Sequence, residues 1–320
     1  MLFRSLGHNL LTFAVMSEIP SVSCSDPFLD AAVTAWLLGS RMAIPGDFRL
    51  RLDVVDAVSA WEDPRSSYPQ ADVDIRAGEP LGWVHITWRS APARARIEED
   101  RPEATIEVSR EALQQVDYFL RSFFLATLIF LWKRAGCYHV HAGTMIAPNG
   151  RGWMLIGDSC SGKSTTTALL ATRGWQVSTD DIAFVTARGD RAAVVGFRSE
   201  IALRPAGLAL LGQAGGIAMP RRGKTGYWPE DLGATWVQTV EPEIIVFTSI
   251  GGERTSLEPM ATVDVIRLLL RGSLWVMFEE RAAQEHLDLL AQLGRQSTCY
   301  RGTLAPDLFA APGALEDFLP

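Results

Sequence analysis

The chain has 320 residues, of which 48% are hydrophobic and 21% charged, as in folded globular proteins, and this excludes a disordered, collagen-like or repeat-dominated chain. Lys and Arg number 30 against 37 Asp and Glu, so the formal net charge is −7. This balance argues against a general nucleic-acid partner, because phosphate neutralisation needs surplus cations. The length predicts about two domains.

Residues 1–108 predict a small N-terminal domain that is mainly β or α+β. The runs FRLRLDVV and LGWVHITWRS alternate apolar and polar residues, as half-buried strands do. Polar residues interrupt the first sixteen positions, so these do not predict a signal peptide, and Met16 is an alternative start to Met1. The role of this region stays open at the level of sequence.

Residues 109–135 predict one buried connecting helix, with Ser109 as its N-cap and Gly136 at its end. Its apolar run FFLATLIFLW is too short to span a bilayer. The four cysteines show no CxxC spacing and predict free thiols. We therefore expect a cytoplasmic protein that has no membrane partner.

Residues 136–320 predict an α/β domain. Its expected strands are YHVHAGTMIAP, WMLIG, WQVS, DIAFVTA, AAVVGF and EIIVFTSI. Its expected helices are GKSTTTALLATR, stopped by Gly174, and segments around 261–271, 280–293 and 306–318.

Residues 157–164 read GDSCSGKS and satisfy G-x-x-x-x-G-K-[ST], the phosphate-binding loop, between a buried strand and a helix. Backbone N–H groups and the helix N-terminus favour a polyphosphate there, and the two glycines permit the tight path. The pattern predicts a polyphosphate ligand. The expected ATP-binding residues are Gly157, Asp158, Ser159, Cys160, Ser161, Gly162, Lys163, Ser164 and Thr165.

Asp180 and Asp181 are expected to lie beside this loop. The helix from Gly162 to Arg173 runs about 18 Å away at 1.5 Å per residue. The strand that follows returns about 16 Å at 3.3 Å per residue. One carboxylate can then hold Mg²⁺ and the other can accept the proton of an attacking hydroxyl.

Other polar side chains are weaker candidates. His139 and His141 share one face of a strand, where a structural role and a catalytic role for His141 are equally open. Arg198, Arg204 and Lys224 are candidates for phosphate or substrate contacts. Lys224 lies in the basic loop PRRGKTGYW, for which solvated loop charge is an equal alternative.

The segment VHAGTMIAPNGRGWMLIGDSCSGKSTTTALLATRGWQVSTDDIAFV resembles the phosphate-loop core of the HPr kinase family. The resemblance implies a fold of the HPr kinase and PEP carboxykinase type, ATP with Mg²⁺, and phosphate transfer to a protein serine. It implies that Lys163 and Ser164 hold phosphate and magnesium, that Asp180 lies on the magnesium side, and that Asp181 is the general base. His141 matches the family's histidine.

The chain lacks the long glycine-rich sequence that the family associates with HPr docking. It is more similar to HPr kinase-like enzymes of peptide-modification systems, some of which phosphorylate a serine of a lasso-peptide precursor. Three hypotheses remain: a kinase for a serine of a peptide or small protein, a kinase for a small hydroxyl compound such as free serine, and a nucleotide-dependent switch or scaffold. The oligomeric state stays open, a homo-oligomer included.

Overall fold

The computed structural model describes residues 22–40, 48–58, 68–70, 72–76, 83–98, 100–212, 214–219, 223–273, 280–311 and 314–319. Contacts between residues divide the chain into two compact units. The N-terminal unit runs up to Tyr138 and also includes the start of helix α8 up to Glu285. The C-terminal unit contains His139–Leu274 and His286–Pro320. The model is mixed α/β and contains several sheets.

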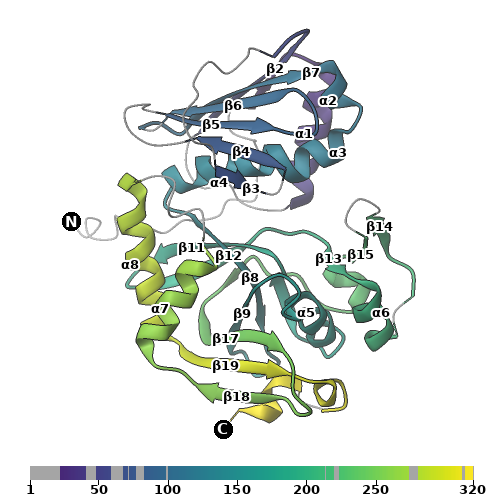
Figure 1. Cartoon of the computed structure of the whole chain (residues 1–320), viewed down its shortest axis with the longest axis vertical. Coiled ribbons are helices and arrows are strands. Elements are labelled where there is room, and N and C mark those ends of the chain that lie inside the picture. Colours follow the sequence, from purple (N-terminus) through teal and green to yellow (C-terminus); the bar gives the residue numbers. More distant parts are fainter. Residues whose placement is uncertain are drawn as a thin grey trace, which may run out of the picture. The chain divides into compact units, whose positions relative to one another are not determined.

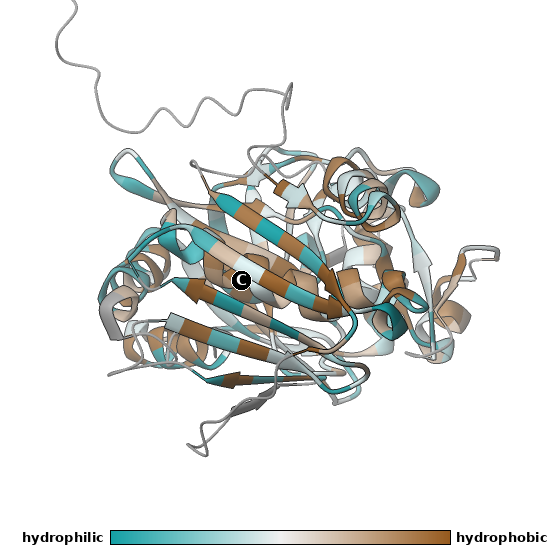
Figure 2. Ribbon diagram, turned by 90° about the horizontal axis from the view of Figure 1, so that it is seen from above, coloured by the Kyte–Doolittle hydropathy of each residue, from teal (hydrophilic) through white to brown (hydrophobic). Residues whose placement is uncertain are grey.

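The N-terminal unit is built on a seven-stranded sheet in the order β1-β2-β7-β6-β5-β4-β3 (Figure 1). β1, β2 and β7 are parallel neighbours and the other pairs are antiparallel. Buried and exposed residues alternate along β2 and β5, as the sequence predicted, and Figure 2 shows this alternation in hydropathy. The strands are β1 (Val22–Cys24), β2 (Arg49–Val55), β3 (Tyr68–Gln70), β4 (Val73–Arg76), β5 (Trp83–Trp88), β6 (Ala93–Glu98) and β7 (Glu103–Ser109).

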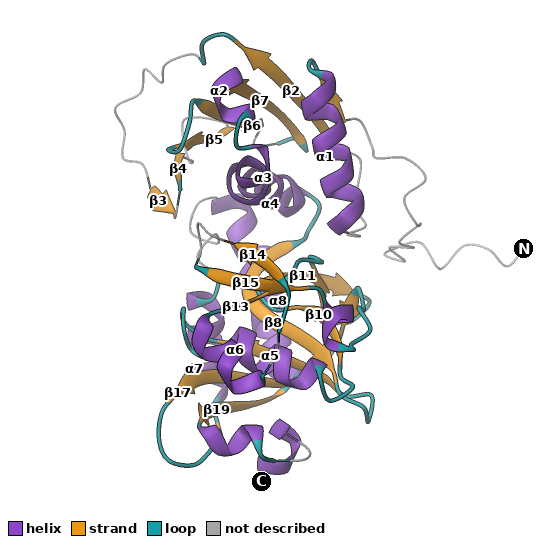
Figure 3. Ribbon diagram, turned by 90° about the vertical axis from the view of Figure 1, so that its right-hand side faces the viewer, coloured by secondary structure: helices purple, strands orange, loops and turns teal. Residues whose placement is uncertain are grey.

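Helices cover one face of this sheet (Figure 3). The prediction of one continuous helix over 109–135 is wrong. Ser109 caps a short helix, but the backbone leaves the helical region at Gln115 (φ −131°, ψ 44°), whose side chain donates to the Ser90 carbonyl, a contact that sequence periodicity does not encode. The helices are α1 (Pro27–Ser40), α2 (Arg110–Leu113), α3 (Val116–Phe119), the π-helix η1 (Leu120–Phe124) and α4 (Leu125–Arg134).

The C-terminal unit contains a nine-stranded mixed sheet. Its path is β16-β12-β11-β8-β9-β17-β19-β18, with β10 paired to β8. β9, β17 and β19 are parallel, so their carboxyl ends share one edge. The strands are β8 (Tyr138–Ile146), β9 (Gly152–Ile156), β10 (Gln176–Thr179), β11 (Ile182–Arg188), β12 (Arg191–Gly196), β16 (Thr239–Val240), β17 (Pro242–Ile250), β18 (Ser256–Pro259) and β19 (Thr298–Leu304).

A small second sheet and several helices complete this unit. Figure 1 shows α5 and α6 on one side of the large sheet and α7 and α8 on the other. The small sheet has the order β13-β15-β14. Its strands are β13 (Ile201–Leu203), β14 (Ile217–Met219) and β15 (Lys224–Tyr227), and the helices are α5 (Lys163–Ala171), α6 (Pro205–Leu211), η3 (Pro229–Leu232), α7 (Thr262–Arg271) and α8 (Glu280–Gln296).

The strands and helices predicted from sequence between 138 and 293 are confirmed. The helix expected over 306–318 is wrong: two short 3₁₀ turns, η5 (Pro306–Phe309) and η6 (Ala314–Phe318), take its place. The sequence has Pro312 and Gly313 between them, and proline breaks a helix interior because it has no backbone N–H to donate. In the described part of the chain, no helix is long and apolar enough to cross a membrane.

The core of the C-terminal unit fixes α5 against the sheet. Trp153 of β9 and Trp175, just before β10, are buried and meet edge to face, with ring centroids 5.4 Å apart. Leu169 and Leu170 of α5 belong to the same apolar cluster. Burial of two indole rings contributes several kcal/mol, roughly 2–3 kcal/mol for each large side chain. The end of α5 and the start of β10 are therefore both held against one core.

Candidate functional site

The loop 157–162 joins β9 to α5 in a conformation that needs glycine at both ends. A Cβ at Gly157 would lie 2.5 Å from Ser161 Oγ and 2.6 Å from the Thr248 carbonyl oxygen, closer than real contacts allow. Gly162 has φ +94°, the left-handed region that side chains disfavour. The Ser161 and Thr248 hydroxyls are 3.0 Å apart, and Thr248 donates to the Ile156 carbonyl. The neighbouring strand β17 thus holds the loop in place.

Cys160 has φ +67°, a positive φ that is unique among the described non-glycine residues. Its side chain is exposed, and Ser159 Oγ lies 3.7 Å from its Sγ. Both residues therefore stand on the outer side of the loop.

Lys163 is the first residue of α5 and its side chain folds back onto the loop. It is 5% exposed, and its Nζ donates to the carbonyl oxygens of Gly157 (2.6 Å) and Asp158 (3.1 Å). Burial lowers the pKa of Lys163, and the charges of Asp181 and Asp180 oppose this shift. The ammonium group therefore lies within the electrostatic field of both acids.

Asp180 follows β10 and is buried, with 3% of its surface exposed. Its carboxylate accepts hydrogen bonds from the Ser164 hydroxyl and the Ala202 backbone. Burial, with a further contribution from the Asp181 charge, raises the pKa of Asp180 to about 7. A carboxylate in this state gains from a nearby cation, since a positive charge favours its ionised form.

Ser164 and Asp180 form an oxygen donor set that suits Mg²⁺, which uses one or two protein ligands and substrate phosphates. Across the described residues, no group of three or more His, Cys, Asp and Glu could hold a metal ion.

Asp181 points to a different partner from Asp180. Its Oδ1 lies 2.6 Å from His141 Nδ1, and both side chains are 41% exposed. The Thr179 hydroxyl accepts the backbone N–H groups of Ile182 and, at a longer distance, Asp181, which fixes the turn between the strands. A half-exposed carboxylate held by an imidazole can receive a proton from a bound hydroxyl.

His139 does not join this pair. It is 9% exposed, packs edge-on to Phe184 and has its pKa lowered to about 4 by burial and by the nearby His141. A histidine in this state is neutral at physiological pH. His139 is therefore a buried, neutral side chain, whereas His141 contacts Asp181.

The structure adds a residue that the sequence did not indicate, Arg271, at the end of α7. Its Nη2 lies 2.7 Å from Asp158 Oδ2 in the loop. The next residue, Gly272, accepts the backbone N–H of His141 at 2.9 Å. The end of α7 therefore lies beside both the loop and His141. An arginine in the last turn of an amphipathic helix is common, so the sequence contains no signal that selects this one.

Of the remaining predicted contact residues, Lys224 lies near the site and Arg198 is engaged elsewhere. Lys224 of β15 lies near enough to influence the pKa values of Lys163 and Asp180. Arg198 instead pairs with Glu230 at 3.0 Å and covers the Trp228 ring at 4.4 Å.

Two further predicted residues lie around α6. Arg204 is exposed at the N-terminus of this helix. A Cβ at Gly207 would lie 2.7 Å from Thr165 Oγ1, so α6 packs closely on the start of α5. The other basic residues of the predicted loop, Arg221 and Arg222, lie outside the described residues.

Comparison with known proteins adds little. No family model and no curated protein matches the chain. Among solved structures, the HPr(Ser) kinase/phosphatase from Coxiella burnetii is similar over 38% of this chain and 70% of that chain, with 15% identity and a TM-score of 0.27. At this identity and TM-score the similarity does not identify a function, which is therefore inferred from the geometry of the site.

Proposed function

We propose that the chain is a phosphotransferase that uses ATP and Mg²⁺ to phosphorylate a serine hydroxyl of a peptide or small protein, such as a lasso-peptide precursor. One observation carries the proposal. A glycine-bounded loop, a buried lysine and two consecutive acids with different partners converge at one place. Ser164 and Asp180, 16 residues apart in sequence, are in direct contact there.

The loop and the N-terminus of α5 would bind the phosphates of ATP. Backbone N–H groups and the helix dipole favour anions at such a terminus. Lys163 would exchange its two carbonyl partners, Gly157 and Asp158, for phosphate oxygens. The Arg271 guanidinium neutralises the Asp158 carboxylate, which would otherwise repel the incoming polyphosphate.

Ser164 and Asp180 would hold Mg²⁺, whose charge offsets that of the transferring phosphate. The raised pKa of Asp180 supports this role. Near pH 7 the carboxylate exchanges its proton readily, so a cation can displace that proton at little cost.

Asp181 would accept the proton of the serine hydroxyl as the oxygen attacks the terminal phosphorus of ATP. The new O–P bond forms as the bond from phosphorus to the leaving ADP oxygen breaks. His141 Nδ1 would donate to the Asp181 carboxylate and hold it toward the acceptor. The exposure of both side chains leaves this side of the site accessible to a substrate.

The test compares Asp181→Asn with Asp190→Asn, a matched exposed aspartate in the turn after β11. Labelled ATP is supplied with precursor peptides containing serine, with free serine, and alone. We expect Asp181→Asn to lose at least about 10²-fold of transfer, the usual contribution of a positioned base, while calorimetry shows unchanged ATP affinity. Asp190→Asn should behave as wild type.

The three acceptor conditions distinguish the hypotheses. Label on a peptide serine supports the proposal, label on free serine supports a small-molecule kinase, and label released only to water supports a nucleotide-dependent switch. Undiminished transfer by Asp181→Asn would remove Asp181 from the mechanism. Failure of the wild-type chain to bind ATP would refute the proposed function itself.

A further inference from the structure

One row of residues crosses the open face of the N-terminal sheet. Backbone pairing places them opposite one another on five neighbouring strands. This is the face away from the apolar core, because the residues on either side of each member are the buried ones in β2, β5, β6 and β7. In strand order the row is Ser23, Arg51, Thr105, Arg96 and His85.

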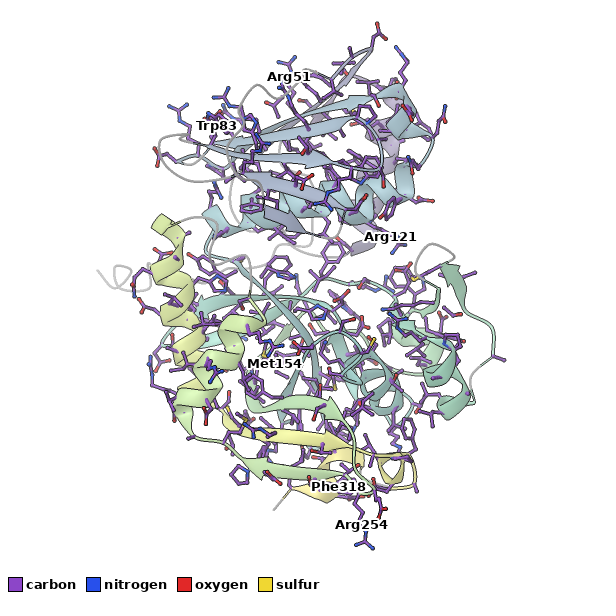
Figure 4. The ribbon with its side chains drawn as sticks, viewed as in Figure 1. Arg51, Trp83, Arg121, Met154, Arg254 and Phe318 are labelled. Carbon is purple, nitrogen blue, oxygen red and sulfur yellow. The ribbon has the colours of Figure 1, made fainter. Side chains whose placement is uncertain are left out.

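Thr105 forms a low point in this row. It is short, and the longer Arg51 and Arg96 flank it on the adjacent strands β2 and β6. A cavity of about 350 Å³ lies here, lined by residues of β1, β2, β6 and β7. Figure 4 labels Arg51 on the outer side of this sheet. The cavity volume lies at the low end for ligand pockets, which suits a small molecule.

The two guanidinium groups can turn toward this cavity. The Nε atom of Arg51 bonds to Asp53, and that of Arg96 lies 3.4 Å from Glu98, each partner on the same strand. Within the described residues, the terminal nitrogens of both arginines make no hydrogen bond or ion pair, and the Arg96 guanidinium lies over the Trp83 ring, 5.7 Å from its centroid. Their strands are about 9.6 Å apart, twice the strand spacing. One oxyanion between them can therefore receive donors from both sides.

The other side of the cavity contains two carboxylates and Arg49. Ile97 pairs with Ala104, so Glu98 and Glu103 occupy neighbouring positions at the ends of β6 and β7. Like charges at neighbouring cross-strand positions are destabilising. Arg96 and Arg49 lie 3.4 and 3.6 Å from these carboxylates but are largely exposed, so solvent weakens both pairs. An ammonium group between the two carboxylates would relieve the repulsion.

We propose that this cavity binds a small zwitterion of amino-acid size, with its oxyanion between Arg51 and Arg96 and its amine beside Glu98 and Glu103. The cavity contains both signs of charge on opposite sides, and each side holds two like charges that a ligand of opposite sign stabilises. The site lies wholly within the N-terminal unit and does not depend on the proposed phosphotransfer.

Calorimetry on the full chain tests the site with three probes: O-phospho-L-serine, inorganic phosphate and ethanolamine. We expect saturable binding of O-phospho-L-serine at millimolar concentration and weaker binding of the other two, since each has only one of the two charges. Arg51→Gln with Arg96→Gln should weaken O-phospho-L-serine binding about tenfold or more, as expected for loss of charge-assisted hydrogen bonds.

Glu98→Gln with Glu103→Gln should weaken binding of O-phospho-L-serine but not of phosphate. Arg94→Gln is the matched control, because Arg94 lies on the same face of β6 but pairs with Glu107 and does not line the cavity. Lys163→Ala separates this site from the loop 157–162 and should leave binding unchanged. The proposal is overturned if the wild-type chain shows no saturable binding of O-phospho-L-serine, or if both double variants bind it as tightly as the wild type does.

Discussion

Two aspartates, one in each unit, show how the same side chain is used differently. Asp74 of β4 lies at the surface, where a hydrogen bond from Arg89 lowers its pKa below the ordinary value of 3.8. Asp180 is buried after β10, where burial raises its pKa to about 7. The protein stabilises the ionised form of Asp74, whereas it buries Asp180 where ionisation is unfavourable.

The difference indicates where function is expected. An exposed ion pair such as Asp74–Arg89 adds a little stability, and its charges are already balanced without a ligand. A buried acid whose pKa is raised costs stability, and proteins keep such groups mainly where catalysis or binding uses them. The contrast therefore agrees with the site proposed in the C-terminal unit.

The largest expected effect is that of Asp180→Asn, which should abolish Mg²⁺-dependent transfer and yet stabilise the protein. Because the folded state raises this pKa, the stability from Asp180 is fully present below its unfolded pKa and is lost as the pH rises through about 7. Asp180→Asn has no carboxyl group to ionise and so does not lose this stability. We expect a gain on the order of a few kcal/mol at pH 8.

Denaturant unfolding at pH 8 and pH 4, with and without Mg²⁺ and ATP, measures this effect. The gain should disappear at pH 4, where the folded wild-type carboxyl is protonated. Mg²⁺ with ATP should stabilise the wild type and not the variant. Equal stability of the two proteins at pH 8 would contradict the raised pKa.

A second comparison concerns glycines in the two units. A Cβ at Gly143 of β8 would lie 2.9 Å from Thr167 Oγ1 of α5, whereas a Cβ at Gly39 in α1 would meet nothing within 4 Å. We expect Gly143→Ala to destabilise by about 1–3 kcal/mol through overpacking. Gly39→Ala should be neutral or stabilising by up to about 1 kcal/mol.

Urea unfolding of both variants checks the prediction, and Thr167→Ala provides a double-mutant cycle. If crowding is the cause, Thr167→Ala should recover part of the loss in the double variant. Additive losses would show that the two residues do not interact.

A smaller effect is expected for Arg271→Gln. Its ion pair with Asp158 is exposed, 65% and 68% for the two side chains, so the free energy of unfolding should change by less than about 1 kcal/mol. ATP affinity should fall up to about tenfold, because Asp158 then repels the phosphates. Calorimetric titration with ATP at two salt concentrations measures the change in affinity. Adding Asp158→Asn to Arg271→Gln should restore the affinity for ATP. No recovery in the double variant would assign Arg271 a direct contact instead.

The smallest effect is expected for Arg89→Ala in the N-terminal unit. The Asp74–Arg89 pair is partly exposed, so its loss should lower the free energy of unfolding only slightly at pH 7. The lowered pKa of Asp74 contributes stability above its ordinary value of 3.8 and loses it as the pH falls further. The difference between variant and wild type should therefore vanish in acid, as unfolding curves at pH 7 and pH 2 would show.

Most helices and strands of the C-terminal unit could be predicted from the sequence, because local sequence patterns mark them. Glycines bound the loop 157–162 and end α5, and alternating or apolar runs mark the strands. The break at Gln115 was not visible in the local pattern, and it coincides with a hydrogen bond from Gln115 to Ser90, 25 residues away. The pair Asp158–Arg271 spans 113 residues and has no local signature. Contacts that depend on tertiary packing were therefore the ones that sequence patterns missed.

The irregular register at the end of β10 explains how one pair of acids can serve two purposes. Pairing with β8 shifts between Val177 and Thr179, so the strand has one residue more than its partner there. After this extra residue Asp180 turns into the protein and Asp181 turns out of it. Since side chains alternate with a period of two, removing Ser178 would exchange the two orientations. The one extra residue of β10 therefore helps to set the different orientations of the two acids, together with the hydrogen bonds that each of them makes.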